Sequence, residues 1–510
     1  MTQGSPSTSK PVSVIAQEAE PPTLHPVGSS DVHPDCRSTR WLVLFIFLGS
    51  ILRVLFIARN SLWSDEIVTL QIASLSWRDF WQVLSSSEAN MGLYYLLLRP
   101  WIHLGSTEAV LRALSAIAGI LTIPAAYKLA KALFGTRIAL ITAFLFSINP
   151  CDVFFSQQAR SYSLQILLVT LSMWLFFTCI RQDRPRSWSP WFWYVLASTL
   201  AVYAHFFSAL ILLAQWIAAA FLPGARNNLR RVVPAAIVVT ALVSPLVVFT
   251  LRHNVGQLDW IQPLNALEVF RLVGFFCAGT SRVLGLVLSA FAIVLIVLVI
   301  RARKSAKYDR TTSLALLFAF LCLVLPVSIT ALASIWKPIF VHRYLVVSLP
   351  AFLLVLACGF GLLRGAIYNW ALATFAALSL IAIFSLRPVE DWRSAVAYIV
   401  GHARSADTVV IYRPYSERGF KYYLQRRCES GCSAELQFVG PSTDFEDSVF
   451  KQAHPRVWLV LSAVDGPATS IQKRLRDSYL PSERRIYSGV QVELFSTAPN
   501  RSGELPERTQ

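Results

Sequence analysis

The sequence predicts a polytopic α-helical membrane protein, with about eleven transmembrane helices followed by a small extracytoplasmic α/β domain. Hydrophobic residues make up 55% of the 510 positions and charged residues only 15%, and the mean hydropathy is +0.52. Soluble domains carry roughly 25% charged residues, so a lipid-facing surface explains the difference. Apolar runs long enough to cross about 30 Å of hydrocarbon recur along the chain, and the short segments between them hold most of the Lys and Arg residues.

Eleven apolar segments are predicted to span the membrane. They run from Trp41 to Ala58, Glu108 to Leu129, Ile138 to Phe155, Tyr162 to Ile180, Trp191 to Phe206, Ala209 to Leu222, Val232 to Leu251, Val283 to Ile300, Thr312 to Ala333, Tyr344 to Leu362 and Tyr368 to Leu386. The run from Asn90 to Leu98 is too short to cross before Arg99 interrupts it. We expect this run to form a helix that lies in the membrane interface.

Basic residues gather on alternate connections, which sets the orientation. The clusters are Arg37/Arg40, Lys128/Lys131/Arg137, Arg181/Arg184/Arg186, Arg226/Arg230/Arg231, Arg301/Arg303/Lys304/Lys307/Arg310 and Arg364. Cytoplasmic loops retain Lys and Arg, so these connections are assigned to the cytoplasm, together with a disordered tail at 1–40 that is rich in Ser, Pro and Thr. The transmembrane domain then covers 41–386, and an odd number of spans places 387–510 outside. The net charge of +17 reflects this orientation and implies no nucleic-acid partner.

The C-terminal domain alternates apolar runs with amphipathic segments. DTVVIY, ELQFVG, RVWLVLS and VQVELFS are typical of strands, whereas SERGFKYYLQRR and SIQKRLRDSY are typical of helices. Cys428 and Cys432 lie four positions apart in this domain. In an oxidising compartment they would form a local disulfide, and the alternative is two unpaired surface thiols. A second ligand pair at zinc spacing does not accompany them.

Two adjacent carboxylates, Asp65 and Glu66, follow the first span in the segment Trp63-Ser64-Asp65-Glu66. Near a low-dielectric boundary they are suited to act as a general base and as a second group that orients substrate or binds a divalent metal such as Mg²⁺ or Mn²⁺. The structural alternative is that Ser64 caps a short helix and the acids complement the helix dipole.

Four further polar residues are expected at the outer membrane surface. Arg160 follows the third span, and its planar guanidinium is suited to bind a phosphate, with Asp152 as the group that orients it. Arg343 begins the tenth span and is a second cation on the same side. His205 ends the fifth span, where a hydrogen-bonded packing role is the alternative to a substrate contact. For Arg160 the alternative is a side chain that snorkels to lipid headgroups.

Several motifs, in order, resemble the GT-C glycosyltransferases, in particular the bacterial relatives of protein O-mannosyltransferase and aminoarabinose transferase. They are WSDE after the first span, GLYYLLLRPW, LRALSAIAGI in the second span, QQARSYSLQ before and into the fourth, and HRYLVVSLP at the tenth. The resemblance covers about Trp41 to Leu362. It departs from the usual pattern at Asn90-Met91-Gly92, where relatives often have His-Pro-Pro, and at Gln158, where many have an acid.

The resemblance implies a multi-pass protein of the bacterial inner membrane that transfers a sugar from a polyprenyl-phosphate donor to a protein, lipid or glycan acceptor, with inversion. Asp65 would be the catalytic base beside Glu66, and Arg160 and Arg343 would stabilise the departing phosphate. The same motifs add Tyr94, Tyr162 and Tyr344 to Asp152 and His205 as expected substrate-binding residues.

Two other classes of function compete with this interpretation. A transporter or lipid flippase would carry charges at the midplane and an internal repeat, whereas the charges here gather at one surface and the two halves show no convincing repeat. An assembly factor anchored by its helices would need only one span. Both comparisons favour an enzyme.

Overall fold

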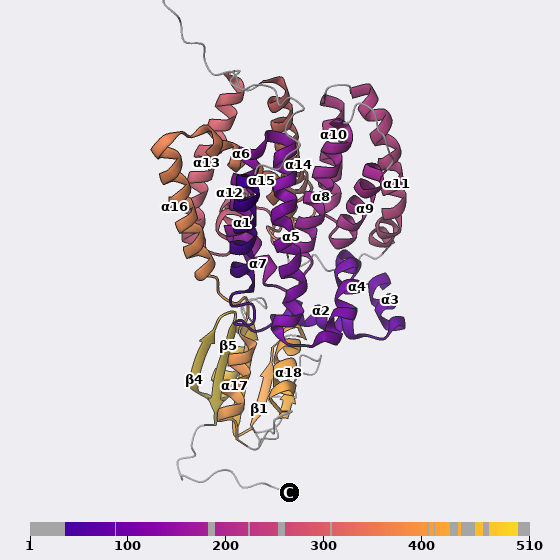
Figure 1. Ribbon diagram of the computed structural model, residues 1–510. Helices are drawn as coiled ribbons and strands as arrows, with labels where there is room; N and C mark the ends of the chain where they lie inside the picture. Colours follow the sequence, from indigo (N-terminus) through magenta and orange to yellow (C-terminus); the bar gives the residue numbers. More distant parts are fainter. Residues whose placement is uncertain are drawn as a thin grey trace, which may run out of the picture.

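The computed structural model describes residues 36–86, 88–181, 189–222, 225–252, 261–305, 309–404, 407–412, 414–428, 437–439, 454–462 and 469–497. Figure 1 shows a bundle of long helices with a small sheet-containing domain at one end. Of the expected tail at 1–40, residues 1–35 lie outside the described residues, as does Cys432. Residues 36–40 were expected to be disordered but form the start of a helix that continues into the first apolar segment. Cys428 is disulfide-bonded, and its expected pairing with Cys432 stays a prediction.

Helices occupy every segment predicted to span the membrane. They are α1 (Cys36–Val54), α5 (Glu108–Phe134), α6 (Thr136–Ile148), α7 (Pro150–Ser156), α8 (Tyr162–Arg181), α9 (Ser189–Ala204), α10 (Ser208–Phe221), α11 (Ala225–Arg252), α13 (Arg282–Lys304), α14 (Arg310–Ala333), η3 (Leu345–Ser348), α15 (Leu349–Leu362) and α16 (Gly365–Phe384). Seven helices among the described residues are long and apolar enough to cross a membrane, or eight if a bent pair is one span. This confirms a polytopic helical membrane protein, and the count of eleven spans stays a prediction.

The bent pair is α6 and α7, which meet at 54° within the predicted span Ile138–Phe155. Pro150 is the first residue of α7, and Asn149 accepts a hydrogen bond from the Asp152 amide at 2.9 Å. Proline has no amide hydrogen to continue α6, but it suits the first turn of a new helix. The break therefore follows from the Asn-Pro pair, and it turns the chain toward Arg160.

Shorter helices lie at the end of the bundle that carries the soluble domain (Figure 1). They are α2 (Ser64–Ser74), α3 (Trp77–Ser86), η1 (Ala89–Met91), α4 (Gly92–Trp101) and η2 (Ile102–Leu104). The apolar run before Arg99 is thus a ten-residue helix, as expected. A further helix that the sequence did not predict, α12 (Ala266–Ala278), precedes α13.

The C-terminal domain contains α17 (Trp392–His402), β1 (Thr408–Ile411), α18 (Pro414–Cys428), β2 (Gln437–Val439), β3 (Arg456–Ser462), α20 (Thr469–Ser478), β4 (Leu480–Tyr487) and β5 (Val490–Ser496). The strand order is β2-β1-β3-β5-β4. β1 is parallel to β2 and β3, and β5 is antiparallel to β3 and β4. All four predicted strands and both predicted helices are present, whereas α17 and the mostly exposed edge strand β4 were not predicted.

Side chains of β3 alternate between the two faces of this sheet. Trp458 and Val460 join the core formed with α17 and α18, and Val457 and Leu459 pack in a second cluster with Leu475 of α20. The first core also contains side chains of α2, α4 and the membrane helices. The soluble domain is therefore packed directly against the segment that follows α1.

Candidate active site

Asp65 lies in the first turn of α2, between two arginines. Its Oδ2 is 3.6 Å from Nη2 of Arg160 and 3.5 Å from Nη1 of Arg343, and its side chain is 17% exposed. These three residues come from separate parts of the chain: α2, the turn between α7 and α8, and the segment before η3. The structure thus brings together the expected base and both expected phosphate ligands.

Arg160 is held by the same turn of helix. Its Nη1 donates to the Asp65 carbonyl at 3.1 Å and to Thr69 Oγ1 at 3.0 Å, and its Nε is buried without a hydrogen-bond partner among the described residues. The guanidinium of Arg343 lies 5.8 Å from the Trp63 ring centroid and 5.7 Å from that of Tyr344. Arg160 is nearly buried, whereas the Arg343 side chain is 28% exposed. These contacts argue against simple headgroup snorkelling for Arg160.

Glu66, adjacent in sequence to Asp65, faces the opposite environment. Its fully buried carboxylate accepts two hydrogen bonds from Arg112, at 2.8 Å and 2.7 Å, and one each from the amides of Ala159 and Trp63, at 2.7 Å and 3.2 Å. Arg112 also donates to three carbonyls of the loop before α2. Glu66 is therefore a structural anchor that leaves Asp65 as the accessible acid.

A divalent metal held jointly by Asp65 and Glu66 does not fit this arrangement. The oxygens of Glu66 are occupied by four donors, and a guanidinium lies within 4 Å of Asp65 on two sides. Within the described ranges, no group of three or more His, Cys, Asp or Glu side chains is suited to hold a metal ion. The two adjacent acids therefore have separate roles and do not form a shared metal site.

Asp152 does not accompany Arg160 as the sequence suggested. Its side chain is fully buried and forms an ion pair with Arg53 of α1, whose guanidinium also donates to the carbonyls of Gly49 and Phe146. Gly119 of α5 allows this approach, since an added Cβ there would lie 2.9 Å from Arg53 Nε. We therefore assign Asp152 to helix packing and leave it out of the proposed site.

Aromatic rings cover the arginines on the side of the membrane helices. The His205 ring lies 5.1 Å from that of Tyr344 and 5.8 Å from that of Tyr162, and its Nε2 is 3.4 Å from Asn90 Nδ2. The Tyr162 hydroxyl is buried and has no hydrogen-bond partner in the described part of the chain. Buried polar groups nearly always have partners. This hydroxyl and Arg160 Nε are therefore candidates to bind an oxygen-rich ligand.

Tyr94 takes a supporting position. It is fully buried, and its hydroxyl lies 2.8 Å from Ser115 Oγ, which in turn donates to the Arg160 carbonyl at 3.1 Å. The expectation of direct substrate contact by Tyr94 does not suit this burial. Its effect would pass through the backbone of Arg160.

Glu88 is a further acidic residue of this region, and the sequence alone did not single it out. Its Oε2 accepts a hydrogen bond from Tyr95 at 3.4 Å. Burial raises the pKa of the Glu88 carboxyl above its usual range, a rise that Arg160 opposes and Asp65 reinforces. The charges of both residues therefore act on the Glu88 carboxyl. Glu88 is far in sequence from the other charged residues of the cluster, so no local sequence motif links it to them.

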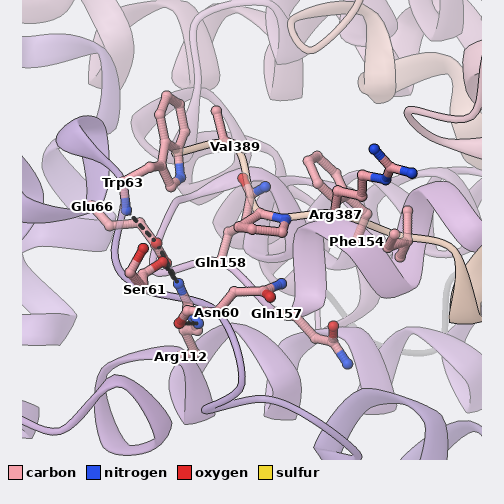
Figure 2. A pocket seen from close by; sticks show the side chains of 12 residues that line it. Asn60, Ser61, Trp63, Glu66, Arg112, Phe154, Gln157, Gln158, Arg387 and Val389 are labelled. Carbon is pink, nitrogen blue, oxygen red and sulfur yellow. Dashed lines mark hydrogen bonds and ion pairs between the residues drawn. The ribbon is translucent and has the colours of Figure 1, made fainter. Parts of the chain in front are cut away.

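Figure 2 shows a small pocket that is separate from this cluster. It is lined by Trp63, Glu66 and Arg112 on the membrane side and by the linker Leu386–Val389 on the other. Asp65, Arg160 and Arg343 do not line it. The pocket thus marks the junction between the two domains.

Part of the chain matches a known protein family. Residues 93–249 match the family model of dolichyl-phosphate-mannose-protein mannosyltransferase, a segment that contains Arg112, Arg160 and His205. No curated protein sequence matches the chain.

Solved structures of similar fold extend the match to most of the chain. ArnT from Cupriavidus metallidurans is 12% identical to this chain, with a TM-score of 0.55. The match to ArnT in the apo state covers 90% of this chain and 98% of ArnT. The match to ArnT bound to undecaprenyl phosphate covers 89% of this chain and 98% of ArnT. The Archaeoglobus fulgidus oligosaccharyltransferase tethered with an acceptor peptide is also 12% identical, with a TM-score of 0.50 and coverage of 84% and 69%.

The fold and the matched segment define a membrane glycosyltransferase of the GT-C class, which confirms the expected enzyme over a transporter or flippase. Over residues 93–249 the chain is similar to the dolichyl-phosphate-mannose-protein mannosyltransferase family. The family is one of glycosyltransferases that use polyprenyl-phosphate sugars.

Proposed function

We propose that this protein transfers a sugar from a polyprenyl-phosphate donor to an acceptor at the extracytoplasmic surface of the bacterial inner membrane, with inversion at the anomeric carbon. The observation that carries the proposal is the placement of the Asp65 carboxylate within 3.6 Å of both Arg160 and Arg343. These three side chains together carry one excess positive charge, which suits an anionic phosphate ligand.

The reaction follows from these positions. The acceptor oxygen or nitrogen attacks the anomeric carbon and passes its proton to Asp65, while the bond between that carbon and the phosphate oxygen breaks. The electron pair goes to the phosphate, and Arg160 and Arg343 stabilise the developing charge. The Tyr162 hydroxyl and Arg160 Nε, which are buried and have no hydrogen-bond partner among the described residues, supply further donors to the sugar or phosphate.

The location of the cluster also supports a lipid-linked donor. ArnT of similar fold has been solved with undecaprenyl phosphate, and such a lipid stays in the bilayer, so the catalytic groups must lie near its surface. Asp65, Arg160 and Arg343 lie in connections between membrane helices, at the end of the bundle that bears the soluble domain. We propose that this end is periplasmic and that the N-terminus is cytoplasmic.

Mass spectrometry of cell-envelope glycans and polyprenyl-linked sugars tests the proposal in a strain lacking the gene. The expected result is loss of one glycan modification with accumulation of one polyprenyl-phosphate sugar, restored by the wild-type chain but not by Asp65→Asn. An unchanged envelope and unchanged lipid-linked sugars would contradict the proposal.

A further inference from the structure

A buried carboxylate of the soluble domain binds the helix that carries Asp65. Glu390, in the linker before α17, is fully buried. Its Oε2 accepts hydrogen bonds from the amide and hydroxyl of Ser64, at 2.8 Å and 2.6 Å, and from Trp392 Nε1 at 2.7 Å. Its Oε1 accepts one from Ser462 Oγ of β3 at 2.8 Å. Glu390 therefore ties the start of α2 to the sheet of the soluble domain.

This contact supplies what the start of α2 lacks locally. The helix begins at Ser64, so the capping position belongs to Trp63 and not to Ser64 as the sequence suggested. An indole has only a donor and cannot accept from the first amides of the helix. The carboxylate of Glu390, 326 residues later in the chain, accepts from the Ser64 amide. Its negative charge also lies at the positive end of the helix dipole.

Neighbouring contacts hold the residues just before α2 in the same way. Ser61 Oγ donates to the Glu390 carbonyl at 2.7 Å. The Leu62 amide donates to the Tyr423 hydroxyl at 2.6 Å, and that hydroxyl donates to Glu108 Oε1 at 2.9 Å. Tyr423 belongs to α18, which packs on α2. The soluble domain thus fixes the segment 61–64 immediately before the proposed base.

We propose that Glu390 is a positioning residue for glycosyl transfer. Because Asp65 directly follows Ser64, the hydrogen bonds from Ser64 to Glu390 fix where the Asp65 carboxylate lies relative to Arg160 and Arg343. In this proposal the soluble domain helps to position the catalytic base. This inference rests on the proposed function, since it assigns Glu390 an effect on transfer through Asp65.

Three variants of the full-length protein in lipid nanodiscs test it. Glu390→Ala removes the acceptors, whereas Glu390→Gln keeps an acceptor oxygen of the same shape. Asp407→Ala is the matched control. Asp407 is a buried carboxylate of the same domain that accepts from Trp458 Nε1 at 2.8 Å and from the Arg404 amide at 3.0 Å. Both alanine variants therefore remove a buried carboxylate that binds an indole, but only one removes a contact with α2.

The first readout is hydrogen exchange of the peptide covering Leu62 to Thr69, which needs no activity. In Glu390→Ala, exchange at the start of α2 should speed by at least about tenfold, because Ser64 loses its amide acceptor. Glu390→Gln and Asp407→Ala should keep the wild-type rate in this peptide. Unchanged exchange in Glu390→Ala, or equal acceleration in Asp407→Ala, would overturn the inference.

The second readout compares binding with transfer. In Glu390→Ala, formation of the envelope glycan should fall at least about tenfold, while the Kd for undecaprenyl phosphate changes less than about threefold, because both arginines come from other elements. Normal transfer by Glu390→Ala would overturn the inference alone. Absence of any transfer by the wild-type protein would overturn the proposed function and this inference together, whatever the exchange result.

Discussion

Arg112→Lys tests whether Glu66 has a structural role while the adjacent Asp65 is the catalytic base. Arg112 donates five hydrogen bonds: two to the Glu66 carboxylate and three to the carbonyls of Ile57, Asn60 and Ser61. A lysine keeps the charge but has three donors on a single nitrogen and cannot reproduce the fork. At least two of the five bonds are therefore lost in a buried site.

The expected cost follows from the burial of this pair, whose side chains are 4% and 0% exposed. Disrupting a buried ion pair typically costs about 3–5 kcal/mol, and lysine should retain part of that, which leaves a loss of roughly 2–3 kcal/mol. Thermal unfolding in detergent, compared as the rate of loss of folded protein at fixed temperature, measures the effect. Arg343→Lys is the matched control, since Arg343 is 28% exposed and its ion pair is longer.

We expect Arg112→Lys to inactivate markedly faster than wild type and Arg343→Lys to inactivate at nearly the wild-type rate. The reverse order would refute the assignment of Glu66 and Arg112 to structure. It would return Glu66 to the catalytic candidates, beside Asp65.

Three further predictions concern donor binding, orientation and charge. Alanine at Arg160 or Arg343 should weaken both undecaprenyl phosphate binding, measured by titration, and transfer, measured in a single turnover. Lysine at either position should restore only part of both. Unchanged affinity in both alanine variants would contradict phosphate binding by these arginines. A reporter fused after Arg181 should be active only in the cytoplasm and one fused after Arg404 only in the periplasm; activity of both on one side would refute the odd number of spans. Because the pKa of Glu88 is raised by burial, its protonation as pH falls makes the cluster more positive. Glu88→Gln should therefore tighten undecaprenyl phosphate binding at pH values where wild-type Glu88 is ionised, and it should reduce the pH dependence of binding. Identical pH titrations of binding by the variant and the wild type would place Glu88 outside the site.

The helices of the membrane domain could be predicted because burial in lipid requires long apolar runs, which the sequence displays directly. The strands of the soluble domain were equally visible where both faces are buried, as in β3. β4 was not, because its Ser482, Glu483, Arg484 and Arg485 form an edge strand without an apolar face. Its pairing with β5 is a tertiary contact that no local pattern reveals.

Within the proposed site, the sequence singled out three charged residues that the structure brings together, Asp65, Arg160 and Arg343. The sequence could not show that Asp65 and Glu66 have different roles. Adjacent helical residues point about 100° apart, and which of the two carboxylates is buried depends on the contact with Arg112, 46 positions from Glu66. The partner of Asp152 was missed for the same reason, since Arg53 was not considered among the surface cations. Such pairings arise from packing between distant segments.

In the proposed mechanism Asp65 removes the acceptor's proton while Arg160 and Arg343 hold the phosphate. Asp65→Asn keeps the shape of the side chain but removes its basicity, so it separates proton removal from phosphate binding. The assay is single-turnover transfer from the polyprenyl-phosphate sugar identified in the deletion strain, with undecaprenyl phosphate affinity measured on the same purified protein.

We expect transfer by Asp65→Asn to fall by about 10²–10⁴-fold. Undecaprenyl phosphate should bind at least as tightly as in wild type, because an anion that competes for both arginines is gone. Transfer at the wild-type rate by Asp65→Asn would show that Asp65 is not the catalytic base.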